Sequence, residues 1–327
     1  MRVRVAVVTL ALAVASLAVG RGQEPAAHRN PIVELLKQHK PVFGLYTPSA
    51  RPFGRRGVPP PATPPKSPAE LAEEALSYGN ADFLFNGSME GGVDRAIPEV
   101  RDLMAALERD ASSRHLPFFG LTRPLMLKSP KIAPDAAGAV RNIGRELDLG
   151  AAGIMFVETE SVDEVRQGLA AMRFKSNGGT RPDMVGAAPA YWGMSEQQYR
   201  KAADVWPLNP DGELINWTIV ESKEGLAHVR EIAAVKGIGV LWPGAGTLRG
   251  VFTTTNEKGE RVFDAAAHEA AIQQVLAACK EFNVPCGYPA NAGDIAARMQ
   301  QGFSVFVMPW GEQGFKAVEI GRRIAGR

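Results

Sequence analysis

The chain has 327 residues, of which 45% are hydrophobic and 22% are charged, and it carries 37 basic and 35 acidic side chains. This composition is that of a globular protein with a large buried core, and one domain of about 250 to 300 residues accounts for it best. The near balance of charge gives no electrostatic basis for binding nucleic acid.

The first residues have the layout of a secretory signal peptide. Two arginines precede an apolar run at residues 5–19, and small residues follow it. We expect residues 1–23 to be removed and the mature chain, residues 24–327, to be periplasmic or secreted. Removal leaves 34 basic and 35 acidic residues. The run is short for a membrane span, so we expect no membrane association after cleavage, with an uncleaved anchor as the alternative.

From residue 43 onward, short β-branched or aromatic runs alternate with stretches whose apolar residues recur every three or four positions, which is typical of parallel βα units. Capping boxes at residues 67–70 and 161–164 mark two helix starts. Eight such units, with no dinucleotide-binding fingerprint after the first strand, predict an α/β fold, a closed (β/α)8 TIM barrel, rather than an open doubly wound sheet. The predicted strands are 43–48, 81–86, 117–122, 153–158, 215–221, 239–243, 284–288 and 304–309.

Two long connections interrupt the alternation. Residues 49–67 are rich in proline and follow the first strand, which places them on the side of a barrel that holds active sites. Residues 174–214 contain two tyrosines and two tryptophans. This second connection covers the barrel, supports a neighbouring subunit or decorates the surface.

The two cysteines are separated by seven positions. Cys279 falls on an apolar helical stripe, so we expect Cys279 and Cys286 to be buried thiols. In an oxidising compartment a disulfide between them is the alternative, because the spacing alone does not fix the required geometry.

Two phrases of the sequence resemble the HpcH/HpaI aldolase and citrate lyase family. Residues 147–155 read LDLGAAGIM, similar to the family phrase LDxGAxGI, and residues 220–237 follow the order and spacing of its IETxEGVxNxxEIAAVxGV segment. The resemblance spans roughly residues 80–325. It implies a TIM barrel of the phosphoenolpyruvate/pyruvate-binding type, assembly into a homo-oligomer, and carbon–carbon bond cleavage or formation on a small 2-oxo or hydroxy acid.

The resemblance also implies a site. Family members hold a divalent metal, Mg²⁺ or Mn²⁺, with two carboxylates, and the metal and an arginine stabilise the enolate of a pyruvate-like substrate. Glu221 stands at the position of the first metal carboxylate and Arg123 at that of the arginine. The turn Gly244, Ala245 and Gly246 stands where backbone amides contact the substrate carboxylate. Each assignment has a structural alternative: Glu221 is an acid at a helix N-terminus, Arg123 is an ion-pair partner, and residues 244–246 form an ordinary turn.

The sequence departs from the family at three positions. No acid follows the sixth strand, where the family has its second metal ligand; residues 86–89 lack the family's histidine base; and Ile219 replaces a glutamine. We expect Glu158, at the end of the fourth strand, to supply the second carboxylate to the metal. Glu90 is a candidate proton carrier.

The sequence therefore predicts a metal-assisted lyase or aldolase, with Glu221 and Glu158 as ligands and Arg123 as oxyanion support. The alternative is an exported, non-catalytic barrel that binds a small organic acid. The sequence names neither the substrate nor the general base.

Overall fold

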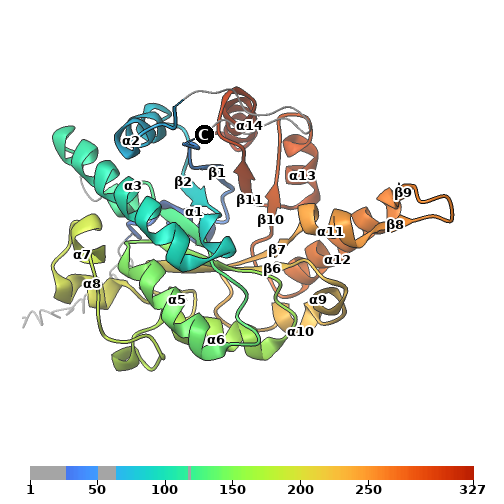
Figure 1. Ribbon diagram of the computed structural model, residues 1–327, viewed down its shortest axis with the longest axis horizontal. Coiled ribbons are helices and arrows are strands. Elements are labelled where there is room, and N and C mark those ends of the chain that lie inside the picture. The colour runs from blue at the N-terminus through green and yellow to red at the C-terminus, as the bar shows by residue number, and fades with distance from the viewer. Residues whose placement is uncertain (1–26, 51–63, 117–118) are drawn as a thin grey trace, which may run out of the picture.

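The computed structural model describes residues 27–50, 64–116 and 119–327, so the predicted signal peptide and most of the first long connection lie outside the described residues. Parallel strands curl into a barrel with helices around it (Figure 1), which confirms the predicted TIM barrel. The barrel strands, in their order around it, are β1 (Val42–Tyr46), β2 (Phe83–Asn86), β3 (Leu125–Lys128), β4 (Gly153–Phe156), β6 (Leu214–Val220), β7 (Val240–Pro243), β10 (Gly287–Pro289) and β11 (Val305–Met308).

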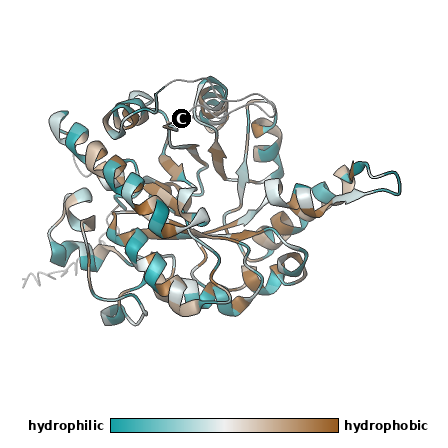
Figure 2. Cartoon of the chain, in the orientation of Figure 1, coloured by the Kyte–Doolittle hydropathy of each residue, from teal (hydrophilic) through white to brown (hydrophobic). Residues whose placement is uncertain are grey.

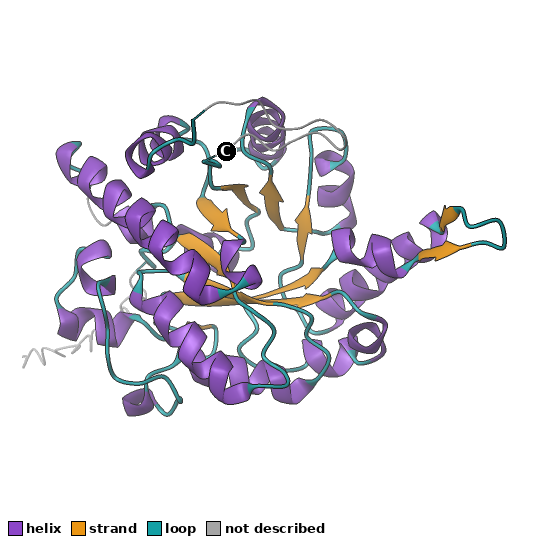
Figure 3. Cartoon of the chain, in the orientation of Figure 1, coloured by secondary structure: helices purple, strands orange, loops and turns teal. Residues whose placement is uncertain are grey.

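Amphipathic helices follow the strands and cover their outer faces (Figure 3). Their apolar sides face the strands and their polar sides face outward (Figure 2). No helix in the described part of the chain is both long and apolar enough to cross a membrane. The surrounding helices are α2 (Pro68–Ser77), α3 (Val93–Ser113), α5 (Ala136–Asp148), α6 (Val162–Met172), α9 (Lys223–Ala227), α10 (Val229–Ala233), α11 (Ala245–Val251), α12 (Ala265–Glu281), α13 (Ile295–Gln301) and α14 (Glu312–Ile324).

One of the two predicted capping boxes forms completely. Ser67 accepts the amide of Glu70, whose carboxylate accepts the amide of Ser67 in return. Ser161 accepts the amide of Glu164, but the Glu164 carboxylate accepts the Glu160 amide at 3.4 Å instead of returning the bond. The prediction of a complete box at the second site was therefore wrong, although the helix begins where it was expected.

The barrel closes at a single narrow seam between β7 and β10. Seven of the strand junctions are regular parallel ladders, whereas β7 meets the chain before β10 through one bridge, Leu241 to Cys286. The Leu241 amide donates to the Pro285 carbonyl at 2.9 Å. This bond completes the ring of strands and removes the exposed sheet edge that an open sheet would leave.

Large aromatic rings fill the barrel. Trp217 stacks on Phe85 and on Trp242, with ring centroids 6.0 and 5.3 Å apart, and the edge of Phe83 meets it at 5.2 Å. A short helix, α1 (Pro31–Lys37), closes the N-terminal end of the barrel with buried Ile32, Val33 and Leu36, which join this interior cluster. The interior is thus a packed core, and only the two ends of the barrel can hold ligands.

The third strand lies later in the chain than predicted. Residues 119–122 form a short helix, α4 (Phe119–Thr122), and the strand is β3, whose run Leu-Met-Leu has no β-branched residue. The aromatic run at 118–119 favoured a strand, but Phe119 is buried on the outer side of the barrel. Pro124 ends α4, because the residue before a proline disfavours the helical conformation. The seventh strand likewise begins at Gly287, three residues later than predicted.

The long connection 174–214 packs on the outside of the barrel against α3 and α5. Trp192 is fully buried and its indole nitrogen donates to the Gly150 carbonyl at 2.9 Å. Arg181 is also fully buried and donates to Asp148 at 2.8 Å. The elements of this connection are η2 (Lys175–Asn177), α7 (Ala188–Tyr191), α8 (Glu196–Ala202) and the two-residue strand β5 (Val205–Trp206), which pairs with β6.

The two cysteines form a disulfide, so the expectation of free thiols was wrong. Cys279 on α12 and Cys286 before β10 have Cα atoms 5.7 Å apart, a separation that a disulfide spans. Both are buried, and the bond joins the helix to the chain segment that closes the barrel seam. A second feature, β8 (Thr253–Thr255) and β9 (Arg261–Phe263), forms a hairpin that projects from the barrel (Figure 1).

Removing this disulfide will lower the free energy of unfolding. The bond closes a loop of eight residues, for which the loss of chain entropy in the unfolded state corresponds to about 2 kcal/mol. We expect the Cys279→Ser/Cys286→Ser double variant to lose about this amount in urea denaturation, whereas Ser195→Ala, at an exposed helix cap, should lose no more than about 1 kcal/mol. Free-thiol titration of the unfolded wild-type protein should show no free thiol until a reductant is added; two free thiols would contradict the assignment.

Glu146 is a carboxylic acid buried between α5 and the loop after β3. It has no exposed surface, and neither carboxyl oxygen has a hydrogen-bond partner within the described residues. Burial raises the pKa of Glu146 to about 8, against smaller opposite effects of Ser129 and Arg145. In the unfolded chain the same group ionises near its ordinary pKa of 4.5. Folding therefore favours the protonated form.

This group predicts a loss of stability with rising pH. Its contribution is complete below pH 4.5 and disappears as the pH rises through about 8, because the unfolded chain releases the proton that the folded chain keeps. We expect Glu146→Gln to match the wild type near pH 4.5 and to exceed it by on the order of 5 kcal/mol at pH 9. Glu73→Gln, on the exposed side of α2, is the control. If the wild type and Glu146→Gln have the same denaturation curve at pH 9, the proposed increase in the pKa of Glu146 by burial is contradicted.

Candidate active site

A pocket of about 180 Å³ lies at the C-terminal ends of the barrel strands. This is the end at which TIM-barrel enzymes hold their active sites, because each strand delivers its last side chain to one common mouth. The pocket is lined by Tyr46, Phe85, Lys128, Met155, Ile219, Glu221, Trp242, Gly244, Ala245, Gly246, Thr247, Pro289 and Val307.

Glu221 lies in the wall of this pocket, directly after β6. Its side chain is only 3% exposed, and Oε1 accepts the backbone N–H of Glu158 at 3.1 Å. Gly244 packs against it so closely that a Cβ at Gly244 would lie 2.7 Å from Oε2. A glycine is therefore required there, and the carboxylate is held in one orientation by its neighbours. The structure thus places Glu221 where the sequence predicted it.

Glu158 contacts Glu221 through its backbone N–H group and not through its carboxylate. Its φ of 45° is unusual for a residue other than glycine. This conformation directs its N–H to Glu221, while its half-exposed side chain lies 3.7 Å from the Lys131 ammonium and is not part of the pocket wall. The two predicted metal ligands therefore do not bring two carboxylates together.

The residues of the mouth do not fit the two-carboxylate metal site that the family resemblance implies. Glu221 is the only acid among the residues that line the pocket, and Lys128 contributes an ammonium group to the same wall. Across residues 27–50, 64–116 and 119–327 there is no group of three or more histidine, cysteine, aspartate or glutamate side chains placed to hold an ion. We therefore derive no chemical step through a metal.

Arg123 lies at the other end of the barrel. It precedes β3 instead of following it, and its Nη1 donates to the Ala75 carbonyl at 2.6 Å. Burial lowers the pKa of its guanidinium. The expected oxyanion position depended on a strand that ended at Thr122, and the later position of β3 corrects it: Arg123 does not lie with Glu221.

Lys128 is the cation that the sequence reasoning missed. It is the last residue of β3, lines the pocket, and forms an ion pair with Glu90 at 2.9 Å. Glu90 is brought there by a 3-10 turn, η1 (Ser88–Gly91), in which Met89 is fully buried as a packing residue. The sequence feature that could have identified Lys128 is the apolar run 125–127 followed by a charged residue, because this pattern indicates a strand that ends at the mouth of the barrel.

Tyr46 adds a phenol to the polar groups of the mouth, which also include the hydroxyl group of Thr247. It is the last residue of β1, and its ring meets the edge of Phe85 at 5.0 Å. Burial raises the pKa of the Tyr46 phenol, while Lys128 opposes the shift and Glu90 adds to it, so these three groups lie within electrostatic range of one another.

The predicted turn Gly244, Ala245 and Gly246 also lines the pocket, next to Glu221. Its position is fixed from both sides: the Gly244 amide donates to the Val220 carbonyl at 2.9 Å, and His268 Nε2 lies 2.8 Å from the Ala245 carbonyl. The mouth thus combines one buried carboxylate, one ammonium group, a phenol and a backbone turn around a space suited to a small polar molecule.

Comparison with known proteins gives one family of structures. No family model matches the sequence. A hydroxypyruvate/pyruvate aldolase of Paraburkholderia phytofirmans is 23% identical over 274 residues, which cover 83% of this chain and 86% of that protein. An HpcH/HpaI aldolase/citrate lyase family protein of Burkholderia cenocepacia superimposes with a TM-score of 0.61 at 21% identity, covering 90% of this chain and 97% of the other.

Two further solved structures agree with this result. An HpcH/HpaI aldolase of Desulfitobacterium hafniense matches with a TM-score of 0.57 at 15% identity, covering 84% of this chain and 88% of its own. Macrophomate synthase matches with a TM-score of 0.57 at 17% identity, covering 91% of this chain and 86% of its own. The resemblance inferred from the two sequence phrases is confirmed: this chain has the fold of the HpcH/HpaI aldolase/citrate lyase proteins and is similar to them over most of its length.

Proposed function

We propose that the chain is a carbon–carbon lyase of the aldolase type that acts on a small 2-oxo or hydroxy acid at the mouth pocket. The observation that carries the proposal is the placement of Lys128, Glu221 and the 244–246 turn around one space of about 180 Å³. The relative named a hydroxypyruvate/pyruvate aldolase, which aligns with most of the chain, supports the same reaction class.

The pocket suits a substrate of a few carbons. Its volume lies below the range of about 300 to 1,000 Å³ that larger ligands need. Ile219, Met155 and Trp242 give the pocket apolar surface, so we place the polar groups of a bound acid toward Lys128 and the 244–246 turn. We assign the substrate carboxylate to the amides of Ala245 and Gly246, because the Gly244 amide already donates to the Val220 carbonyl.

In this proposal Lys128 supplies the positive charge for catalysis. When the carbon–carbon bond of a 4-hydroxy-2-oxo acid breaks, the hydroxyl loses its proton, its oxygen forms the aldehyde carbonyl, and the bonding electrons pass to the 2-oxo group as an enolate. A fixed ammonium group beside that oxygen stabilises the developing charge. Glu90 does not line the pocket, but it is paired with Lys128 at 2.9 Å at the edge of the mouth, and we propose it as the acceptor of the hydroxyl proton.

A non-catalytic organic-acid-binding barrel is the second candidate function. A specific observation favours it: fully buried Met89 occupies the segment where the family has its histidine base, and the pocket lining contains one carboxylate. Such a protein would keep the turn at 244–246 and the cation at 128 for binding and would lack turnover.

We also propose that the chain is exported, as its first residues predict. The disulfide between Cys279 and Cys286 supports this, because disulfides persist in oxidising compartments. Self-association, which the family resemblance implies, stays a prediction.

Turnover tests the lyase directly. Purified mature protein is incubated with oxaloacetate or a 4-hydroxy-2-oxo acid, with Mn²⁺ or with EDTA, and pyruvate release is followed through a coupled lactate dehydrogenase assay against enzyme-free blanks. We expect turnover in EDTA, and a loss in kcat/KM of about 100-fold or more in Lys128→Met. Lys66→Gln, which breaks a surface ion pair with Glu74, should stay within about 3-fold. Absence of pyruvate above the blanks under every condition would contradict the lyase.

Binding of an enolate mimic separates the two candidate functions. Oxalate resembles the planar enolate of pyruvate, and an enzyme binds such a mimic more tightly than the ground-state acid. Titration calorimetry should show oxalate binding at least about 10-fold more tightly than pyruvate, with the preference lost in Lys128→Met. Equal affinities for the two acids would favour the non-catalytic binder.

A further inference from the structure

A second and larger pocket lies at the opposite end of the barrel. It has a volume of about 860 Å³ and opens among the segments that precede β1, β6, β7, β10 and β11. It forms at the seam, because β10 begins only at Gly287 and leaves residues 284–286 with a single bridge to β7. We call it the basal pocket. None of its lining residues belongs to the mouth pocket.

Every ionisable side chain that lines the basal pocket is basic. They are Lys37, Lys40, Lys236, Lys280 and His39, and no aspartate or glutamate is present in the lining. In a chain with nearly equal numbers of acids and bases, such separation creates a local positive potential. None of the four lysines lies within 4.0 Å of a carboxylate in the described part of the chain, unlike Lys66, Lys128 and Lys131.

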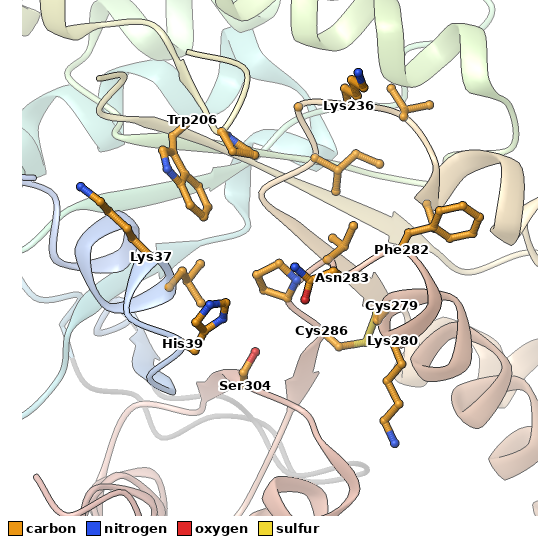
Figure 4. A pocket seen from close by; sticks show the side chains of 18 of the residues that line it. Lys37, His39, Trp206, Lys236, Cys279, Lys280, Phe282, Asn283, Cys286 and Ser304 are labelled. Atoms are coloured by element: carbon orange, nitrogen blue, oxygen red, sulfur yellow. A yellow bond between two sulfur atoms is a disulfide. The ribbon is translucent and has the colours of Figure 1, made fainter. Parts of the chain in front are cut away.

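Polar and aromatic groups face the interior of the pocket. The indole of Trp206, the imidazole of His39, the amide of Asn283 and the hydroxyl of Ser304 lie around its space, whereas the ammonium groups of Lys37, Lys236 and Lys280 point outward from it (Figure 4). The pocket thus offers a flat aromatic surface and hydrogen-bonding groups, and the long, flexible side chains of lysines lie at its edge.

Two of these interior residues stand where glycine is the usual choice. His39 and Asn283 are the residues after the C-caps of α1 and α12, with φ values of 54° and 52°. Glycine takes this left-handed conformation with least strain. The chain instead places two hydrogen-bonding side chains there, and both face the basal pocket.

We propose that the basal pocket binds a small molecule that joins a planar ring to a multiply charged anionic group, as a nucleoside phosphate does. The ring lies against Trp206 and bonds to Asn283 or His39, while lysines such as Lys37 and Lys236 neutralise the anion. The volume of the pocket falls within the range of about 300 to 1,000 Å³ typical of sites for molecules of this size. This proposal does not depend on the function of the mouth pocket.

The experiment compares three probes by titration calorimetry at low ionic strength. AMP carries both the ring and the charge, adenosine carries only the ring, and inorganic phosphate carries only the charge. We expect AMP to bind one to one, at least about 10-fold more tightly than either fragment, and more weakly as salt rises. Binding that saturates with several AMP molecules per chain, or AMP no tighter than phosphate, would overturn the proposal.

Variants locate the bound AMP. Trp206→Ala and the Lys37→Gln/Lys236→Gln double variant should each weaken AMP binding about 10-fold or more. The Lys258→Gln/Lys316→Gln variant, which removes two exposed lysines outside the pocket, should change it less than 2-fold. Oxalate should not displace AMP; displacement would put AMP in the mouth pocket. If the lysine variant lowers the melting temperature and leaves AMP affinity unchanged, the lysines serve only the helix C-termini and the proposal is wrong.

Discussion

Closure of the barrel at the seam between β7 and β10 is the constraint on which both ends of the molecule depend. The Leu241 amide donates to the Pro285 carbonyl at 2.9 Å. This bond joins β7 to the segment before β10, where a single bridge takes the place of a ladder. Because the ring is closed, all strands end at one mouth and begin at one base. The Cys279–Cys286 disulfide holds the same segment to α12, so a covalent bond reinforces the weakest junction of the sheet.

The mouth and the base differ in how their charges are arranged. At the mouth, charged groups are individually positioned: Glu221 is held by a backbone amide and by close contact with Gly244, and Lys128 is paired with Glu90. Such fixed groups suit the stabilisation of charge at one atom during a reaction. At the base none of the four lysines forms an ion pair within the residues that the structure describes, and their long side chains can meet an anion in more than one geometry.

In the proposed lyase, the positive charge for catalysis differs from that of the family, while the scaffold is the same. A metal ion and an ammonium group perform related work, since both place positive charge beside a developing enolate oxygen. The chain has Lys128 in the pocket wall, and the Glu158 carboxylate, which could have shared a metal with Glu221, extends to Lys131. The electrostatic requirement of the proposed reaction is thus met by a side chain of the protein.

The barrel, the positions of most strands and the place of Glu221 could be predicted from the amino-acid sequence alone. Alternation of strands and helices repeats along the chain, and local periodicity is enough to reveal it. The sequence pattern misplaced the third strand, because the aromatic run at 118–119 favoured a strand there, whereas the strand is the apolar run that begins at Leu125. Arg123 was therefore expected at the C-terminal end of the third strand, which Lys128 occupies.

The directions of the side chains and the contacts between distant segments depend on how the whole chain folds, and local sequence patterns do not encode them. The φ of 45° at Glu158 turns a predicted ligand into a backbone donor, and no local pattern encodes that angle. The disulfide depends on a Cα separation of 5.7 Å that seven residues of spacing leave open. The basal pocket gathers its cations from segments far apart in the chain, such as Lys37, Lys236 and Lys280, so it exists only once the strands have closed.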